Sequence, residues 1–203
     1  MRRLAVVVIA SLSVGLAACV TTTPAHNLGA DTVRGLRLER VEVNVGPPGQ
    51  VTWAGLLEET MEAEGKKTGR QITDPQAVVP QAKAEALSRL NAQARKNLEP
   101  ALRTRLAGNK PVVARVTVHT VYVPTVAGAL FGGTAGGSSG MSASIDFVDA
   151  RTGATVLSYP KTGFMTQGGY KLNMGTSGSI SHDPIERMFA DMGGQVAAWL
   201  APG

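Results

Sequence analysis

The chain has 203 residues, of which 43% are hydrophobic and 17% are charged, and its formal net charge is +5. Hydrophobic residues in this amount, spread over several periodic segments, support a folded core and exclude a wholly disordered chain. The 24 glycines follow no three-residue period, which excludes collagen. A single cysteine excludes an internal disulfide framework and any metal site built from several cysteines.

The N-terminus has the pattern of an export signal. Arg2 and Arg3 precede an uncharged, mostly apolar run from residue 4 to residue 18. This run is shorter than the roughly 20 residues that a transmembrane helix needs, so it predicts a signal peptide over residues 1–18. Without the two arginines the chain has 18 basic and 15 acidic side chains. A formal charge of +3 is too weak to indicate nucleic acid binding.

The signal ends in Leu16-Ala17-Ala18-Cys19, which resembles the lipobox of bacterial lipoproteins. The resemblance implies that Cys19 becomes the first residue and carries acyl chains such as palmitate. Two or three chains anchor a protein firmly, since each buried methylene contributes about 0.8 kcal/mol. Val20 is not the aspartate associated with inner-membrane retention, so we expect the outer membrane, with the protein facing the periplasm. The alternative is an ordinary secretory signal with a chance cysteine.

Residues 19–35 predict a lipidated cysteine and a flexible tether, because they show no sustained period and contain turn formers. We expect His26 to be a solvated loop residue and not a metal ligand, since no second histidine or acidic cluster is near it. Residues 36–203 are expected to form a single periplasmic domain.

The first half of this domain predicts one strand and two helical regions. Apolar residues alternate from residue 36 to 45 with a change of phase at Glu39-Arg40, which predicts a strand with a β-bulge. We expect residues 46–49 to end this strand, residues 53–64 to form a short acidic helix and residues 65–80 to form a loop. Helical spacing continues from residue 81 to 107, where Pro100 kinks the helix or starts a second one.

The second half predicts three strands and a final helix. In the strand 112–123 we expect one shared face for Val112, Ala114, Val116, Val118 and Tyr122. Residues 141–149 and 154–159 predict a hairpin around the turn 149–153. The final helix starts with Asp183 as N-cap and Pro184 in the first turn, and its apolar stripe continues to residue 200.

The predicted order is β-α-α-β-β-β-α, which indicates an α+β fold. We expect a sheet of about four strands, antiparallel or mixed, with helices packed mainly on one face. The chain resembles the group of envelope lipoproteins that includes the curli-secretion lipoprotein, the lipoprotein activator of peptidoglycan synthases and the N-terminal domain of the Tol-system β-propeller protein. The resemblance rests on the lipobox, the helix-to-strand step over 98–123, the glycine-rich connection and the run Ile-Asp-Phe-Val-Asp-Ala-Arg-Thr-Gly at 145–153. It implies a non-enzymatic scaffold, channel builder or activator.

One segment formally matches a catalytic motif. Residues 136–140 read Gly-Gly-Ser-Ser-Gly and place Ser138 as in a G-x-S-x-G nucleophile elbow, with Asp146 or Asp149 and His182 following in the order of a triad. The motif requires a strand-to-helix turn, whereas this one lies between two predicted strands. We therefore expect no enzymatic activity. His119 and His182 have no metal-ligand partner at usable spacing, so we expect no metal and no cofactor.

Gly128, Gly132, Gly136 and Gly140 recur at every fourth residue. A helix through them would present a smooth groove for oligomerisation or membrane insertion. The segment is also short, polar in part and interrupted by Pro124, and we favour a mobile hairpin loop.

The long helix carries a basic stripe of Arg89, Lys96, Arg103 and Lys110, seven residues apart. The stripe suits anionic headgroups or an acidic partner. We favour a solvated helix face, in which the preceding acidic helix attracts the basic one.

The sequence therefore predicts a membrane-anchored periplasmic lipoprotein that acts as a non-catalytic binding or envelope-assembly module. Its partner would be an envelope protein or a peptidoglycan-associated one. The alternative is an oligomeric subunit of a secretion or channel complex that uses residues 128–140, and a serine hydrolase is a distant third. The oligomeric state stays open at this level.

Overall fold

The computed structural model describes residues 26, 28–125, 138–166, 171–172, 180–181 and 183–201, with only the backbone at 47–50, 171–172 and 180–181. Four strands form one sheet in the order β1-β2-β3-β4. Their bounds are β1 Leu36–Trp53, β2 Lys110–Val123, β3 Ser139–Asp149 and β4 Thr155–Thr166. β1 and β2 run parallel, and the other two neighbouring pairs are antiparallel. The short strands β5 (Lys171–Leu172) and β6 (Ile180–Ser181) pair with each other.

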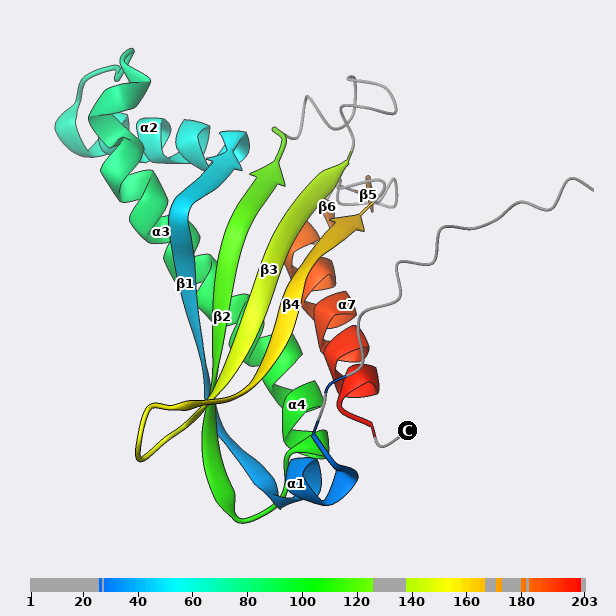
Figure 1. Ribbon diagram of the computed structural model, residues 1–203. Helices are drawn as coiled ribbons and strands as arrows, with labels where there is room; N and C mark the ends of the chain where they lie inside the picture. Colours follow the sequence, from blue (N-terminus) through cyan, green and yellow to red (C-terminus); the bar gives the residue numbers. More distant parts are fainter. Residues whose placement is uncertain are drawn as a thin grey trace, which may run out of the picture.

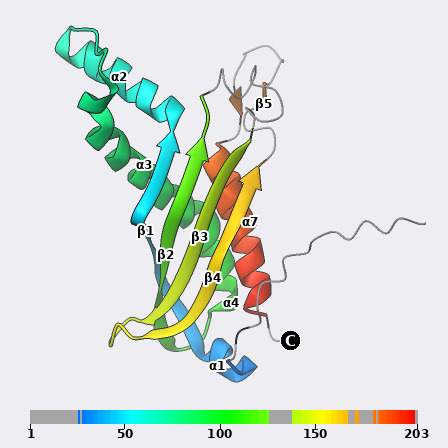
Figure 2. The same ribbon diagram turned by 45° about the horizontal axis from the view of Figure 1, so that its top comes forward.

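The helices α3, α4 and α7 pack on one face of this sheet and leave the other face open (Figures 1 and 2). The helical elements are α1 Ala30–Gly35, α2 Ala54–Thr68, the 3-10 turn η1 Pro75–Val78, α3 Val79–Gln93, the π-turn η2 Ala94–Leu98, α4 Glu99–Arg105 and α7 Pro184–Trp199. The α+β prediction, with a mixed four-stranded sheet and helices on one face, is confirmed. We call the open side the outer face, and the end where β2 ends and β3 begins the upper end.

The first strand contains the predicted bulge but is longer than expected. Its register against β2 shifts between Leu38 and Arg40, as the change of phase predicts. A second shift lies between Val45 and Gln50, and pairing then continues to Trp53. Residues 46–49 therefore do not end the strand. An edge strand tolerates prolines and bulges, because one side of its backbone needs no ladder partner.

The helical region differs from the prediction at both ends. α2 continues to Thr68 and stops at Gly69, whose φ of 67° is the left-handed conformation of a glycine C-cap. The expected loop over 65–80 thus holds the end of α2, the turn η1 and the start of α3. Pro100 lies in the first turn of α4, after the π-turn, so it starts a second helical segment. A proline ring clashes with the carbonyl four residues earlier, and the wider turn provides room for it.

The core lies between the sheet and these helices. The predicted stripe of α7 is buried, with Ile185, Met188, Phe189, Met192 and Val196 all at 0% exposure. Asp183 caps this helix by accepting a hydrogen bond from the Ile185 backbone N–H at 2.9 Å. The predicted N-cap and the packing of the final helix are both confirmed.

The hairpin between β3 and β4 has the predicted turn, although β4 continues to Thr166 instead of ending near residue 159. Asp149 Oδ1 accepts hydrogen bonds from the backbone N–H groups of Arg151 and Thr152, and Gly153 takes a φ of 72°. These two bonds, partly opposed by burial, lower the pKa of the Asp149 carboxyl below its usual value.

The folded part begins before residue 36. Residues 30–35 form α1, whose Val33 is 4% exposed and belongs to the core, and Leu28 packs against it. The His26 ring lies edge-on to Trp199, with 5.0 Å between ring centroids. The predicted tether is therefore too long at its C-terminal end, because apolar residues within this segment join the core. His26 is half-buried and not a fully solvated loop residue.

Candidate functional site

The outer face carries a hollow at the upper end of the sheet. Thr52 pairs with Tyr122 there, and Tyr122 pairs with Gly140. Gly140 in turn pairs with Met165, so one row of residues crosses all four strands. The hollow around this row has a volume of about 520 Å³. It is lined by Thr52, Thr120, Val121, Tyr122, Ser138, Ser139, Gly140, Met141, Ser142, Phe164 and Met165.

Two large apolar side chains are exposed in this row. Met165 is 73% exposed and Tyr122 is 46% exposed. Gly140 lies between them without a side chain, and a Cβ at that position would be 3.9 Å from Met165 Cγ. The row is therefore a shallow depression between an aromatic ring and a flexible thioether.

A β-bulge turns Tyr122 outward. The register of β2 against β3 shifts between Val118 and Thr120, and beyond this point Val121 and Val123 are the buried residues. The prediction that Tyr122 shares a face with Val112, Ala114, Val116 and Val118 is thus wrong, whereas those four are buried as expected. A bulge changes the phase of every later residue in the strand, and bulges often re-aim a side chain beside a site.

The helix side of the upper end holds two buried hydroxyls. Ser139 is 0% and Thr166 is 5% exposed, and the two residues pair across β3 and β4. Neither hydroxyl oxygen has a hydrogen-bond partner among the residues that the structure describes. Buried polar groups are nearly always paired, and an unpaired one is costly. Ser139 is also among the residues that line the hollow, although its hydroxyl is buried on the helix side of the sheet.

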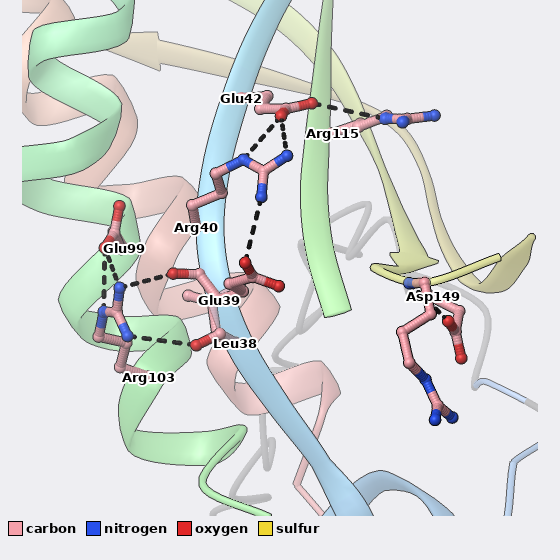
Figure 3. Close-up of polar contacts among 9 residues, drawn as sticks. Leu38, Glu39, Arg40, Glu42, Glu99, Arg103, Arg115 and Asp149 are labelled. Atoms are coloured by element: carbon pink, nitrogen blue, oxygen red, sulfur yellow. Dashed lines mark hydrogen bonds and ion pairs between the residues drawn. The ribbon is translucent and has the colours of Figure 1, made fainter. Parts of the chain in front are cut away.

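Lower on the outer face the polar side chains are paired with one another. Glu42 accepts a hydrogen bond from Arg40 Nε at 2.8 Å, and its other oxygen lies 3.5 Å from Arg115 Nε (Figure 3). The second of these contacts crosses from β1 to β2.

Pairs of the same kind join the neighbouring strands. His119 Nε2 lies 2.9 Å from Ser144 Oγ, and Ser158 donates a hydrogen bond to Asp146 at 2.6 Å. In the upper hollow, the Thr120 and Ser142 hydroxyls form a pair of the same kind, with 2.6 Å between their oxygen atoms.

Arg103, from the predicted basic stripe, holds the first bulge of β1. Its guanidinium donates to the carbonyl oxygens of Leu38 at 3.2 Å and Glu39 at 2.9 Å (Figure 3). Glu99, one turn earlier on α4, holds the guanidinium in place through a bond of 2.9 Å to Nε. Asn91 makes similar bonds farther along, where its side chain accepts from the Val43 backbone N–H at 3.2 Å. The helix side chains thus occupy hydrogen-bonding groups on the free edge of β1, which protects it from pairing with another strand.

Arg89 joins α2 to α3. It donates to Glu85 at 2.9 Å and to Glu59 at 2.8 Å, and its guanidinium carbon lies 5.7 Å from the centroid of the Trp53 ring. Burial disfavours the charged guanidinium, but the two glutamates outweigh this effect and raise the pKa of Arg89. The expected attraction between the acidic and basic helices is present in this contact.

The other two stripe residues also have carboxylate neighbours. Lys96 Nζ lies 3.1 Å from Glu186 on α7, and Lys110 Nζ lies 3.8 Å from Asp149. Lys110 begins β2 and so does not lie on the helix. All four predicted cations have intramolecular partners, which favours the solvated-face interpretation over a site for an acidic ligand.

Ser138 does not come together with the aspartates of the formal triad. β3 extends from Ser139 to Asp149, so Asp146 is about 26 Å and Asp149 about 36 Å from Ser138 along the strand. Asp146 bonds Ser158, and Asp149 holds the hairpin turn (Figure 3). His182 lies outside the described residues. A nucleophile needs its base within hydrogen-bond reach, and these aspartates cannot orient one beside Ser138.

The glycine repeat is only partly visible. Gly128, Gly132 and Gly136 lie outside the described residues, and Gly140 lies in β3. The alternative of a helix through all four glycines is therefore wrong at Gly140. Pairing with β2 and β4 fixes that residue in an extended conformation. A hairpin connection over 128–140 likewise ends earlier than predicted.

Cys19 and the lipobox residues Leu16, Ala17 and Ala18 lie outside the described residues. In the part of the chain that is described, no helix is both long enough and apolar enough to cross a membrane. Within the same part, no group of three or more histidine, cysteine or acidic side chains is placed to hold a metal ion.

Comparison with solved structures gives distant likenesses, one of which is described here. No family model matches the chain, and no curated protein matches it. A crystal structure of a "putative lipoprotein" from Caulobacter crescentus is similar over 55% of this chain and 80% of its own, at 20% sequence identity and a TM-score of 0.35. At that identity and TM-score the likeness carries no argument about function.

Proposed function

We propose that the chain is a lipid-anchored envelope protein of the outer membrane that docks a periplasmic protein through the hollow at the upper end of its outer face. The lipobox at residues 16–19 supports the anchor. α1, where the chain enters the fold, lies at the lower end, since Leu36 pairs with Lys110 at the start of β2. The hollow is at the opposite end of the strands and points away from the attachment.

The observation that carries the proposal is the exposure of Tyr122 and Met165 in one row. Leu87 on α3 is the remaining large hydrophobic residue counted as exposed in the described part of the chain. Tyrosine and methionine are enriched in protein interfaces, where an aromatic ring gives rigid contact area and a thioether adapts its shape. Gly140 between them leaves room for a side chain of the partner.

The lining of the hollow also indicates the chemistry of the partner segment. Besides the Tyr122 hydroxyl it contains five serine and threonine side chains, and no charged residue among the residues described: Thr52, Thr120, Ser138, Ser139 and Ser142. Such a surface favours an uncharged segment that inserts an apolar side chain and hydrogen-bonds through its backbone. This distinguishes the hollow from the ion-paired surface below it.

Site-specific photo-crosslinking in intact cells tests the docking site. A crosslinking phenylalanine analogue at Met165 is expected to give a discrete heterologous product. The matched control is the same analogue at Ser158, which is exposed on the same strand about 23 Å lower. Equal products from both positions, or none from Met165, would contradict the docking site.

The alternative function is that of a ring or channel subunit. The crosslinked products and the size of the assembly in solution distinguish it from a docking module. Such a subunit crosslinks to copies of itself, and a chain beginning at residue 20 assembles into a closed oligomer in sedimentation experiments. A module that docks another protein gives heterologous products and stays small.

The absence of catalysis is also part of the proposal. A serine-directed phosphonate is expected to leave Ser138 unlabelled in the parent chain, as in the variant Ser138→Ala, because no aspartate of the formal triad lies near Ser138. Labelling of Ser138 by a serine-directed phosphonate, lost in the variant, would establish the hydrolase alternative instead.

A further inference from the structure

The helices α2 and α3 form an arm beside the end of β1 (Figure 2). A second hollow lies at this junction. Its volume is about 240 Å³. The lining residues are Val51, Thr52, Trp53, Ala54, Leu56, Leu57, Val79, Ala82, Lys83 and Ala86. We call it the arm hollow. It is separate from the outer-face hollow, although Thr52 lines both.

The arm hollow exists because small side chains face it. Ala82 and Ala86 are on the buried side of α3, and Ala54 begins α2. Any larger side chain at these positions would fill the space. An apolar cavity of about 150 Å³ holds a benzene ring, and pockets for drug-sized ligands begin near 300 Å³. The arm hollow therefore suits one short hydrocarbon chain.

The rim supplies one cation. Lys83 is exposed and is the charged residue of the lining, and no carboxylate among the described residues lies within ion-pair distance of it. Arg89 nearby is already bonded to Glu85 and Glu59. Leu87 follows Lys83 by one turn on α3 and is 36% exposed, so apolar surface continues beside the ammonium group.

We propose that the arm hollow binds the tail of a single-chain anionic amphiphile from solution, with the anionic group on Lys83. The apolar walls exclude water from the tail, and the ammonium group selects the sign of the head. Each methylene that enters the hollow strengthens binding about fourfold. This site goes beyond protein docking, and its test is independent of the docking experiment.

Fluorescence titration of Trp53 tests the site with defined probes. The chain beginning at residue 20 keeps every described residue and needs no detergent, which would itself compete. The chain has two tryptophans, so Trp199→Phe leaves Trp53 as the single fluorescent tryptophan. We expect decanoate to bind saturably below its micelle concentration. Its affinity should be about 16-fold higher than that of octanoate, since its tail has two more methylenes. We expect decyltrimethylammonium to bind at least tenfold more weakly than decanoate.

Matched variants assign the binding to the hollow. Lys83→Glu is expected to weaken decanoate at least tenfold, whereas Lys66→Ala, which removes an exposed lysine paired with Glu62 on α2, leaves it unchanged. Ala86→Leu fills the hollow and is expected to abolish binding. Lys83 is on the surface, so its variant tests the site even if Ala86→Leu does not fold.

Three outcomes would overturn the proposal. One is the absence of a saturable fluorescence change with every probe. Another is equal binding of the anionic and cationic probes, or binding that Lys83→Glu leaves unaltered. The third is Lys83-dependent sedimentation with phosphatidylglycerol vesicles in place of decanoate binding, which would assign the arm hollow to a bilayer.

Discussion

Two adjacent glycines in α7 offer a sharp test of how the helices pack. Gly194 is exposed, and a Cβ there would have nothing within 4 Å. A Cβ at Gly193 would lie 3.2 Å from Ala101 Cβ and 3.3 Å from the Asn97 carbonyl oxygen. Both positions are inside the same helix, so replacement by alanine brings each the same gain in helix propensity, about 0.5–1 kcal/mol.

Gly194→Ala is therefore expected to stabilise the domain by about 0.5–1 kcal/mol. Gly193→Ala adds the cost of overpacking, typically about 1–3 kcal/mol. Because the propensity gain is common to both variants, the difference in their free energies of unfolding reports the steric cost alone. In a domain of this size a difference of about 1–3 kcal/mol corresponds to roughly 2–12 °C in Tm.

Thermal and urea unfolding followed by circular dichroism measure both variants against the parent chain. A higher Tm for Gly194→Ala together with a lower or unchanged Tm for Gly193→Ala is the expected result. Equal stabilisation by the two substitutions would refute the close packing of α7 against η2 and α4.

Phe189→Ala is expected to cost about 3–5 kcal/mol, because it empties a site at 0% exposure in the core, and chemical denaturation measures this loss. Asp149→Asn should flatten the acid dependence of stability. The folded-state pKa of Asp149 is lowered, so its contribution is present above the usual value of 3.8 and is lost as the pH falls further, which unfolding curves from pH 5 to pH 2 can follow. Arg103→Met should expose the Leu38 and Glu39 carbonyls and increase aggregation in light scattering, whereas Arg105→Met should not, since Arg105 makes no such bond among the described residues. Cys19→Ser should release the protein into the soluble periplasmic fraction, and a variant still membrane-bound after a high-salt wash would contradict lipidation as its anchor.

Alternation of polar and apolar residues predicts the facing of a strand where polar and apolar residues are clearly distinct. The bulge near Arg40 is visible in the sequence because charged residues interrupt the apolar phase. The bulge in β2 is not visible, because Val121, Tyr122 and Val123 are all compatible with a core. The available signal was that Tyr122 has a valine on each side. Burying both valines turns the amphipathic ring outward.

The basic stripe shows a different limit of sequence reasoning. Glu85 and Glu99 precede Arg89 and Arg103 by four residues, so these pairs follow from helix geometry alone. The partner of Lys96 is 90 residues away in the sequence, at Glu186 on α7. A local pattern identifies a cation on a helix surface, but only the tertiary fold shows which carboxylate lies opposite.

The position of the anchor constrains where each proposed ligand is found. Leu28, which packs on the core, follows Cys19 by nine positions, a stretch that spans at most about 32 Å. β2 alone extends about 45 Å from the lower to the upper end. If Cys19 is lipidated, an upright domain holds both hollows well clear of its own bilayer. The arm hollow then meets single-chain amphiphiles in the periplasm more readily than lipids of the leaflet that holds the anchor. In the same arrangement the outer-face hollow would be presented to the periplasmic partner that we propose for it.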